Sequence, residues 1–115
     1  MAYAKGDVVL VAFPFRDKRA AKVRPAVVLS GADYNRRGDV ILAAITTHAP
    51  RLPIDYPIQG WREAGLVAPS VVRIQLATVA VRRLLFRPGR MAKDDLARVD
   101  LLLTKVLELD QSKKS

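Results

Sequence analysis

The sequence predicts a mainly β protein in which one compact sheet is followed by a C-terminal helix. Short apolar runs rich in Val and Ile recur over residues 7–80, and turn-forming Gly, Pro and Asn residues separate them. From Asp94 the apolar spacing changes to the period of an amphipathic helix. At 115 residues the chain is expected to form a single domain, with a core over about residues 6–109 and a frayed tail over 110–115.

Three antiparallel strands are expected in succession near the N-terminus. Residues 7–13, DVVLVAF, are apolar at both alternating sets of positions, which predicts a central strand with two buried faces. The β-branched run over 25–30 predicts the second strand. Pro25 cannot donate to a sheet ladder, so it is expected to be the first residue of this strand or to mark an edge. Residues 39–46, DVILAAIT, predict the third strand, and the preceding YNRRGD supplies the turn.

A long basic hairpin loop is expected between the first two strands. Its residues 14–23 contain one aspartate and four cations, Arg16, Lys18, Arg19 and Lys22. The whole chain has a formal net charge of +9, which favours nucleic acid or an acidic protein segment as a partner over a merely solvated basic surface. The absence of cysteine and the single histidine, His48, exclude disulfides, thiolate chemistry and histidine-rich metal sites.

The second half of the chain is expected to complete the sheet. Prolines interrupt residues 50–57, although 52–58 suits a short edge strand. Residues 60–65 predict a helical turn or tight loop, with Trp61 filling the core or a dimer interface. Residues 70–78 predict a longer strand, and a last short strand is expected before Pro88 and Gly89.

The C-terminal helix is expected from Asp94 to about Leu109. One face carries Leu96, Val99, Leu103, Val106 and Leu107, while Asp95 and the other charged residues fall mostly off it. Further leucines give more apolar surface than one face requires, which fits an interface. No apolar run reaches the roughly 20 residues of a membrane span and no signal sequence is evident, so a cytoplasmic location is expected.

Five motifs in this order resemble the MazF/PemK toxin family of type II toxin–antitoxin systems: GDVVLVAFPF, RPAVVLS, YNRRGDVILAAITT, GLVAPSVVR and DDLARV. The resemblance implies a small SH3-like β-barrel with a C-terminal helix, assembled as a homodimer. It further implies a sequence-specific endoribonuclease that cuts single-stranded RNA without a metal or other cofactor. The products would carry a 2′,3′-cyclic phosphate and a 5′-hydroxyl, and a cognate acidic antitoxin would neutralise the enzyme.

The resemblance also assigns residues. The family's catalytic arginine before proline corresponds to Arg24, and its catalytic threonine at the end of the third strand corresponds to Thr46. The arginine of the V-V-R triplet corresponds to Arg73. Some PemK-like members have an aspartate two residues after that arginine and a histidine in the first loop, where this chain has Gln75 and Lys18.

These residue types suit RNA transesterification. A guanidinium at Arg24 matches the oxygens of a pentacoordinate phosphorus, and it is a poor general base because its pKa lies above about 12. The Thr46 hydroxyl would donate toward the developing charge. Arg73 is either a surface charge or a phosphate contact. His48 is the one side chain of a type suited to proton transfer near neutral pH, although a solvated loop histidine is the favoured interpretation.

The remaining candidates concern RNA binding. The basic loop would neutralise neighbouring phosphates, and Phe15 and Tyr34 would stack on bases, with hydrophobic packing as the alternative for Phe15. A rival hypothesis is a non-catalytic module of the same fold, either a gyrase-poison-like protein or a nucleic-acid-binding one. The R-P and I-T-T motifs favour the ribonuclease, because a gyrase poison does not need them.

Overall fold

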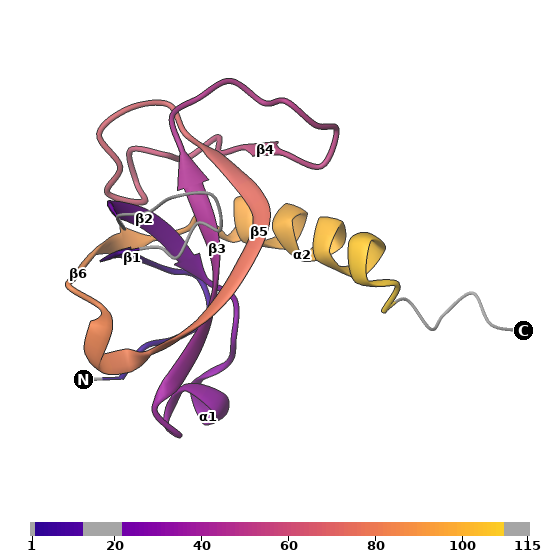
Figure 1. Cartoon of the computed structure of the whole chain (residues 1–115). Coiled ribbons are helices and arrows are strands. Elements are labelled where there is room, and N and C mark those ends of the chain that lie inside the picture. Colours follow the sequence, from indigo (N-terminus) through magenta and orange to yellow (C-terminus); the bar gives the residue numbers. More distant parts are fainter. Residues whose placement is uncertain (1, 13–21, 110–115) are drawn as a thin grey trace, which may run out of the picture.

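The computed structural model describes residues 2–12 and 22–109 (Figure 1). Within these ranges, six strands form one antiparallel sheet in the order β4-β5-β3-β2-β1-β6. The strands are β1 (Asp7–Ala12), β2 (Val23–Val28), β3 (Asp39–Thr46), β4 (Tyr56–Pro57), β5 (Val71–Ala80) and β6 (Phe86–Arg90). The helical segments are α1 (Ala32–Asn35), η1 (Val81–Arg83) and α2 (Lys93–Leu107). The predicted sheet, with its C-terminal helix, is confirmed.

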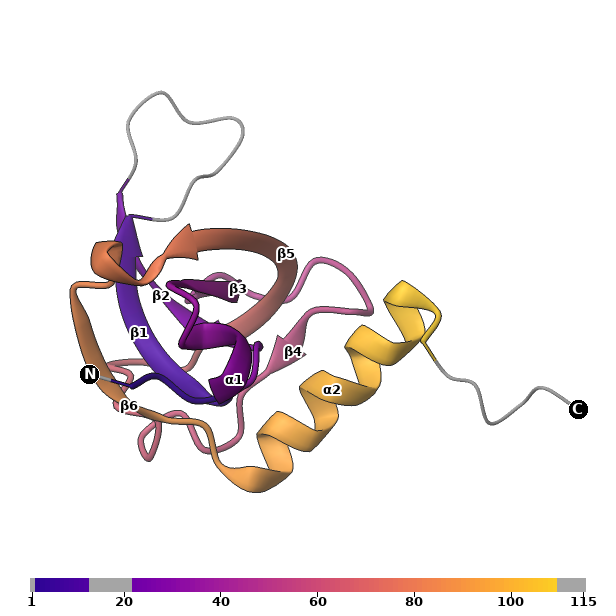
Figure 2. The same cartoon turned by 90° about the horizontal axis from the view of Figure 1, so that it is seen from below.

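The sheet curls into a half-barrel and buries an apolar cluster on each face (Figure 2). One cluster joins Val8, Val27, Ile45 and Val72 of the strands to Val99 of α2, so the helix covers this face. The other contains Val9, Val28, Leu42, Val79 and Leu84, and the curled sheet itself encloses it. Because neighbouring residues of a strand point to opposite faces, both clusters draw on the same strands.

The second strand begins earlier than expected, and this corrects the position of Pro25. β2 starts at Val23, so Arg24 and Pro25 lie inside it and pair with Val11 and Leu10 of β1. The β2–β3 ladder begins only at Ala26, which pairs with Ala44. A proline fits here because the ladder to β3 does not include it and its missing N–H is not needed there.

Two further details differ from the expectations. The segment before β3 contains the one-turn helix α1 ahead of the predicted turn. The last strand, β6, runs through Pro88 and Gly89 instead of ending before them. It is an edge strand, where proline is tolerated, and a Cβ at Gly89 would lie 2.6 Å from the carbonyl oxygen of Ala64.

The apolar face of α2 is shorter than the periodicity predicts. Leu96, Val99 and Leu103 pack on the sheet, but Val106 and Leu107 are 40% and 49% exposed because the last turns extend beyond the sheet (Figure 1). No helix in residues 2–12 and 22–109 is long and apolar enough to cross a bilayer.

Asp95 was expected off the buried face but is only 1% exposed. Its Oδ1 accepts hydrogen bonds from the hydroxyl of Tyr56 at 2.5 Å and from the backbone N–H of Gln59 at 3.0 Å, and its Oδ2 accepts one from the N–H of Gly60 at 2.8 Å. The carboxylate therefore ties the first turn of α2 to the segment that follows β4.

We expect Asp95→Ala to lower the free energy of unfolding by about 2 kcal/mol, because it leaves the Tyr56 hydroxyl and two part-buried N–H groups without their acceptor. The exposed neighbour Asp94 provides the control, and Asp94→Ala should cost less than about 1 kcal/mol, the usual size of a helix-dipole effect. Urea unfolding of the two variants measures the difference. Equal losses would show that the Asp95 hydrogen bonds contribute little.

Candidate active site at one end of the sheet

Four strands meet at one end of the sheet. β1 ends at Ala12, which pairs with Val23 at the start of β2, and β3 ends at Thr46, which pairs with Val71 at the start of β5. The antiparallel order therefore gathers the first residues of β2 and β5 beside the last residues of β1 and β3. Polar side chains at this end are not needed for the apolar core, so they are available for chemistry.

Arg24 and Thr46 both lie at this end of the sheet. Ala26 and Ala44 form the last pair of the β2–β3 ladder, and Arg24 and Thr46 each lie two residues beyond this pair. Alternation along the strands also puts both side chains on the same face of the sheet. Each residue is half-buried, so a fixed backbone supports it while part of its side chain reaches solvent. The fold thus puts the two residues that the sequence predicts as catalytic at the same end of the sheet.

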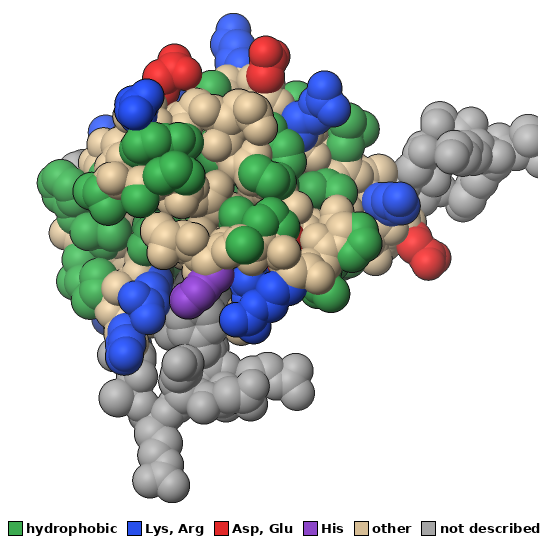
Figure 3. All heavy atoms as spheres, turned by 90° about the horizontal axis from the view of Figure 1, so that it is seen from above, with side chains coloured by type: hydrophobic (Ala, Val, Ile, Leu, Met, Phe, Trp, Pro, Cys, Tyr) green, Lys and Arg blue, Asp and Glu red, His purple; other side chains and the backbone are tan. Residues whose placement is uncertain are grey.

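His48 contacts Thr46. The Thr46 hydroxyl oxygen lies 3.2 Å from His48 Nδ1, and it also accepts a hydrogen bond from the His48 backbone N–H at 3.2 Å. His48 is exposed, as expected for a loop residue, but its ring is part of the site. In Figure 3 the single histidine lies among Lys and Arg side chains on this part of the surface.

Arg73 lies on the next strand, two residues beyond Val71. Ile45 pairs with Val72 and Ala43 with Leu76, so three residues of β5 stand opposite Ala44 alone. Such a bulge redirects side chains locally. The Arg73 side chain is 22% exposed, and its Nε lies 3.9 Å from Oδ2 of the buried Asp55. Sequence reasoning missed Asp55, which only the pairing of β4 with β5 brings to this place.

The other predicted RNA-binding residues are distributed differently. Lys22 is exposed beside Arg24, whereas Phe15, Arg16, Lys18 and Arg19 lie outside the described residues. Tyr34 belongs to α1, which follows β2 at the opposite end of the sheet (Figure 1). The geometry therefore does not bring Tyr34 to Arg24. Gln75, which stands where some PemK-like members have aspartate, lies in the β5 bulge and is half-buried.

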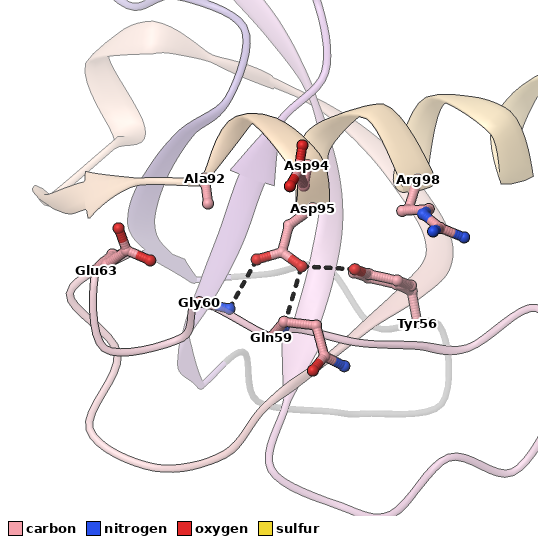
Figure 4. Close-up of a pocket in the computed structure, with 8 residues that line it drawn as sticks. All are labelled: Tyr56, Gln59, Gly60, Glu63, Ala92, Asp94, Asp95 and Arg98. Atoms are coloured by element: carbon pink, nitrogen blue, oxygen red, sulfur yellow. Dashed lines mark hydrogen bonds between the residues drawn. The ribbon is translucent and has the colours of Figure 1, made fainter.

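A separate hollow of about 570 Å³ lies between α2 and the segment after β4 (Figure 4). Its lining consists of Tyr56, Gln59, Gly60, Glu63, Ala92, Asp94, Asp95 and Arg98. Burial and the hydrogen bond to Asp95 raise the pKa of the Tyr56 phenol to about 12. The phenol therefore stays protonated and continues to donate to Asp95, which makes this hollow a structural junction.

The fold and the cationic sheet end define a small basic β protein suited to a polyanion. The family model of PemK-like, MazF-like toxins of type II toxin–antitoxin systems matches residues 4–107. The chain therefore belongs to the PemK-like, MazF-like toxin family.

Solved structures share this fold. An endoribonuclease of a mycobacterial species, in complex with its cognate antitoxin, has a TM-score of 0.77 at 17% identity over 95% of this chain and 98% of that chain. MazF of Deinococcus radiodurans has a TM-score of 0.77 at 24% identity, with 94% and 98% covered. The Mycobacterium tuberculosis toxin MazF-mt6 has a TM-score of 0.74 at 22% identity, with 90% and 98% covered. No curated protein matches the chain in sequence.

Proposed function

We propose that this protein is an endoribonuclease toxin that cuts single-stranded RNA at specific sequences by metal-independent transesterification. The observation that supports this proposal is that Arg24 and Thr46 lie at the same end of the sheet, each two residues beyond the last pair of the β2–β3 ladder. Family membership supports it, and so does the fold shared with a mycobacterial endoribonuclease.

Arg24 is proposed to stabilise the charge on the reacting phosphate. Attack of a ribose 2′-oxygen on the adjacent phosphorus creates a phosphorane with an additional negative charge. A guanidinium can contact two of its oxygens at once through parallel hydrogen bonds. Since Arg24 extends from a paired strand, its charge is held in place before the charge on the phosphorane develops, which is how preorganised donors accelerate a reaction.

Thr46 is given a neutral donor role toward the same phosphate. Its oxygen already accepts the N–H of His48, so its one hydroxyl proton goes either to His48 Nδ1 or to a phosphate oxygen. In our account this proton goes to the phosphate oxygen when RNA is bound, and His48 is not its acceptor. In our account the neighbouring guanidinium groups make the 2′-hydroxyl more acidic, and water accepts its proton. The 2′-oxygen then bonds to phosphorus and the bond from phosphorus to the 5′-oxygen breaks. Water returns a proton to the 5′-oxygen, so the products are a 2′,3′-cyclic phosphate and a 5′-hydroxyl.

The proposed protein partners of this chain are an antitoxin and a second copy of itself. The mycobacterial endoribonuclease and the Deinococcus MazF have each been solved with an antitoxin, so we propose a cognate acidic antitoxin for this chain. The net charge of +9 complements such a segment. We also propose a homodimer, which the exposed apolar residues at the end of α2 would suit.

Incubation of the purified protein with long single-stranded RNA in EDTA tests the proposed function. We expect cleavage at a few defined sequences and products that end in a cyclic phosphate. Binding without cleavage would instead support a nucleic-acid-binding module. If the protein neither binds nor cleaves RNA, that result would favour the gyrase-poison-like alternative.

Arg24→Ala should abolish cleavage, which we define as a loss of at least about 100-fold in rate, because it removes the charge that stabilises the phosphorane. The fold should survive, since Arg24 is outside both apolar clusters. Arg37→Ala, which removes the same charge from an exposed turn, is the matched control and should retain parental activity. The cleavage rates of both variants and the parent are measured on one labelled RNA. Parental activity in Arg24→Ala would refute the catalytic role of Arg24.

Thr46→Val keeps the β-branched shape that suits a strand and deletes only the hydroxyl. We expect the rate to fall by roughly 100-fold, the usual effect of losing one donor to developing charge. Thr47→Val, at the adjacent exposed position, is the control. A loss of less than about threefold in Thr46→Val would mean that its role is structural.

His48→Gln should keep nearly the parental rate, and the same pH profile between about pH 5.5 and 8, because in our account no imidazole accepts the 2′-hydroxyl proton. Single-turnover rates across this pH range measure both properties. If the variant loses activity together with a titration that the parent shows, His48 is the general base and the proton-transfer part of our account is wrong.

A further inference from the structure

Arg73 carries hydrogen-bond donors that no described residue satisfies. Its Nε and Nη2 atoms are buried, and within residues 2–12 and 22–109 neither has a hydrogen-bond acceptor. Burying a guanidinium is costly unless its charge is compensated and its N–H groups are bonded. The protein supplies the first of these conditions and not the second. Because 22% of the side chain stays exposed, a ligand can reach the Arg73 cation only along that exposed part.

Asp55 supplies the compensating charge. Its side chain is 3% exposed, and its Oδ2 accepts hydrogen bonds from the backbone N–H groups of Arg51 at 2.7 Å and Leu52 at 3.1 Å. Tyr56 pairs with Val72, and continuing this register by one residue sets Asp55 opposite Arg73. Asp55 therefore fixes the loop before β4 and faces the guanidinium from a neighbouring strand.

The separation between the two side chains is informative. At 3.9 Å, Oδ2 of Asp55 is beyond the 2.7–3.2 Å range of an N–H···O hydrogen bond to Nε of Arg73. A second buried aspartate behaves differently, because Asp7 accepts hydrogen bonds from Arg90 at 2.9 Å and from Arg87 at 3.2 Å. Asp7 uses the donors of its partners, whereas Asp55 attracts Arg73 without using them.

We propose that Asp55 is a positioning residue, which holds the Arg73 side chain so that the exposed part of this cation faces a phosphate of the bound RNA beside Thr46. This inference rests on the proposed function, because it assigns the acceptor to the RNA backbone. Val71 pairs with Thr46, so Arg73 lies two residues, about 7 Å along β5, from the residue opposite the proposed catalytic donor. That placement suits a contact with the RNA backbone near the reacting phosphate.

The effect of Asp55→Asn on RNA affinity separates this proposal from a general electrostatic effect of the carboxylate, because the two predict changes in opposite directions. Removal of a carboxylate from an RNA-binding surface should strengthen RNA binding, because the repulsion of phosphate falls. A positioning role predicts the opposite. Asp55→Asn keeps an oxygen that can accept from Arg51 and Leu52 but removes the charge that holds Arg73, so it should weaken RNA binding about tenfold.

The measurement is the affinity of the full chain for a fluorescent single-stranded oligonucleotide made uncleavable by 2′-O-methyl groups. Asp33→Asn makes the same change in net charge at an exposed position in α1 and should leave affinity unchanged or slightly higher. The slope of log affinity against log salt should fall by about 0.7 in Asp55→Asn, as expected when one phosphate contact is lost. Unchanged or tighter binding by Asp55→Asn would overturn the proposal.

A double-mutant cycle tests whether Asp55 acts through Arg73. Arg73→Gln alone should weaken binding at least as much as Asp55→Asn, and adding Asp55→Asn to Arg73→Gln should cost less than about twofold further. Additive losses would mean that Asp55 acts only through the fold. If Asp55→Asn does not fold, Asp55→Glu serves instead: it keeps the net charge and lengthens the side chain by one methylene, and it should still weaken binding. Parental binding by a folded Asp55→Glu would contradict the proposal.

An assay of RNA cleavage by the parent protein separates failure of the Asp55 positioning role from failure of the proposed ribonuclease activity. If the parent cuts RNA and the cycle is additive, the positioning role is wrong and the proposed function stands. If the parent binds RNA without cutting it and the cycle is strongly coupled, the positioning role stands for a binding protein and the proposed ribonuclease activity fails.

Discussion

The antiparallel register of β3 is the constraint on which the rest of the structure depends. On one side it pairs with β2 so that Ala26 meets Ala44, and on the other it pairs with β5 so that Thr46 meets Val71. A slip of one residue in either ladder would move Ile45 from the face covered by α2 to the opposite face. The burial of both faces therefore fixes the register, and the register in turn sets the strand ends at which Arg24, Thr46 and Arg73 lie.

Buried carboxylates connect the remaining parts to this sheet. Asp7 binds two arginines of β6, and Asp95 binds the segment after β4 to the start of α2. In both cases the hydrogen bonds of the carboxylate are made within the protein, so the contacts stabilise the fold. Asp55 accepts hydrogen bonds within its own loop and only attracts Arg73. One residue type thus serves the fold at two positions and, in our proposal, the function at the third.

The sequence predicts the parts of the molecule that follow local rules. Alternation over residues 7–13 and 39–46 and the helical period after Asp94 give the strands and α2 correctly, because burial on one or two faces sets these patterns. The start of β2, the burial of Asp95 and the approach of Asp55 to Arg73 depend on pairing between distant segments, which no local pattern encodes. The roles of Arg24 and Thr46 came from the family resemblance, and the contact between Thr46 and His48 came from the structure alone.

Mapping the RNA on the protein by NMR tests the central claim most directly. An uncleavable 2′-O-methyl oligonucleotide would be titrated into ¹⁵N-labelled protein while amide chemical shifts are followed. We predict that the largest changes occur at Arg24, Thr46 and Arg73, and that the amides of α1 and of the hollow beside Asp95 change little. Shifts concentrated at α1 or at that hollow, with the strand ends unaffected, would contradict our assignment of the sheet end as the RNA site.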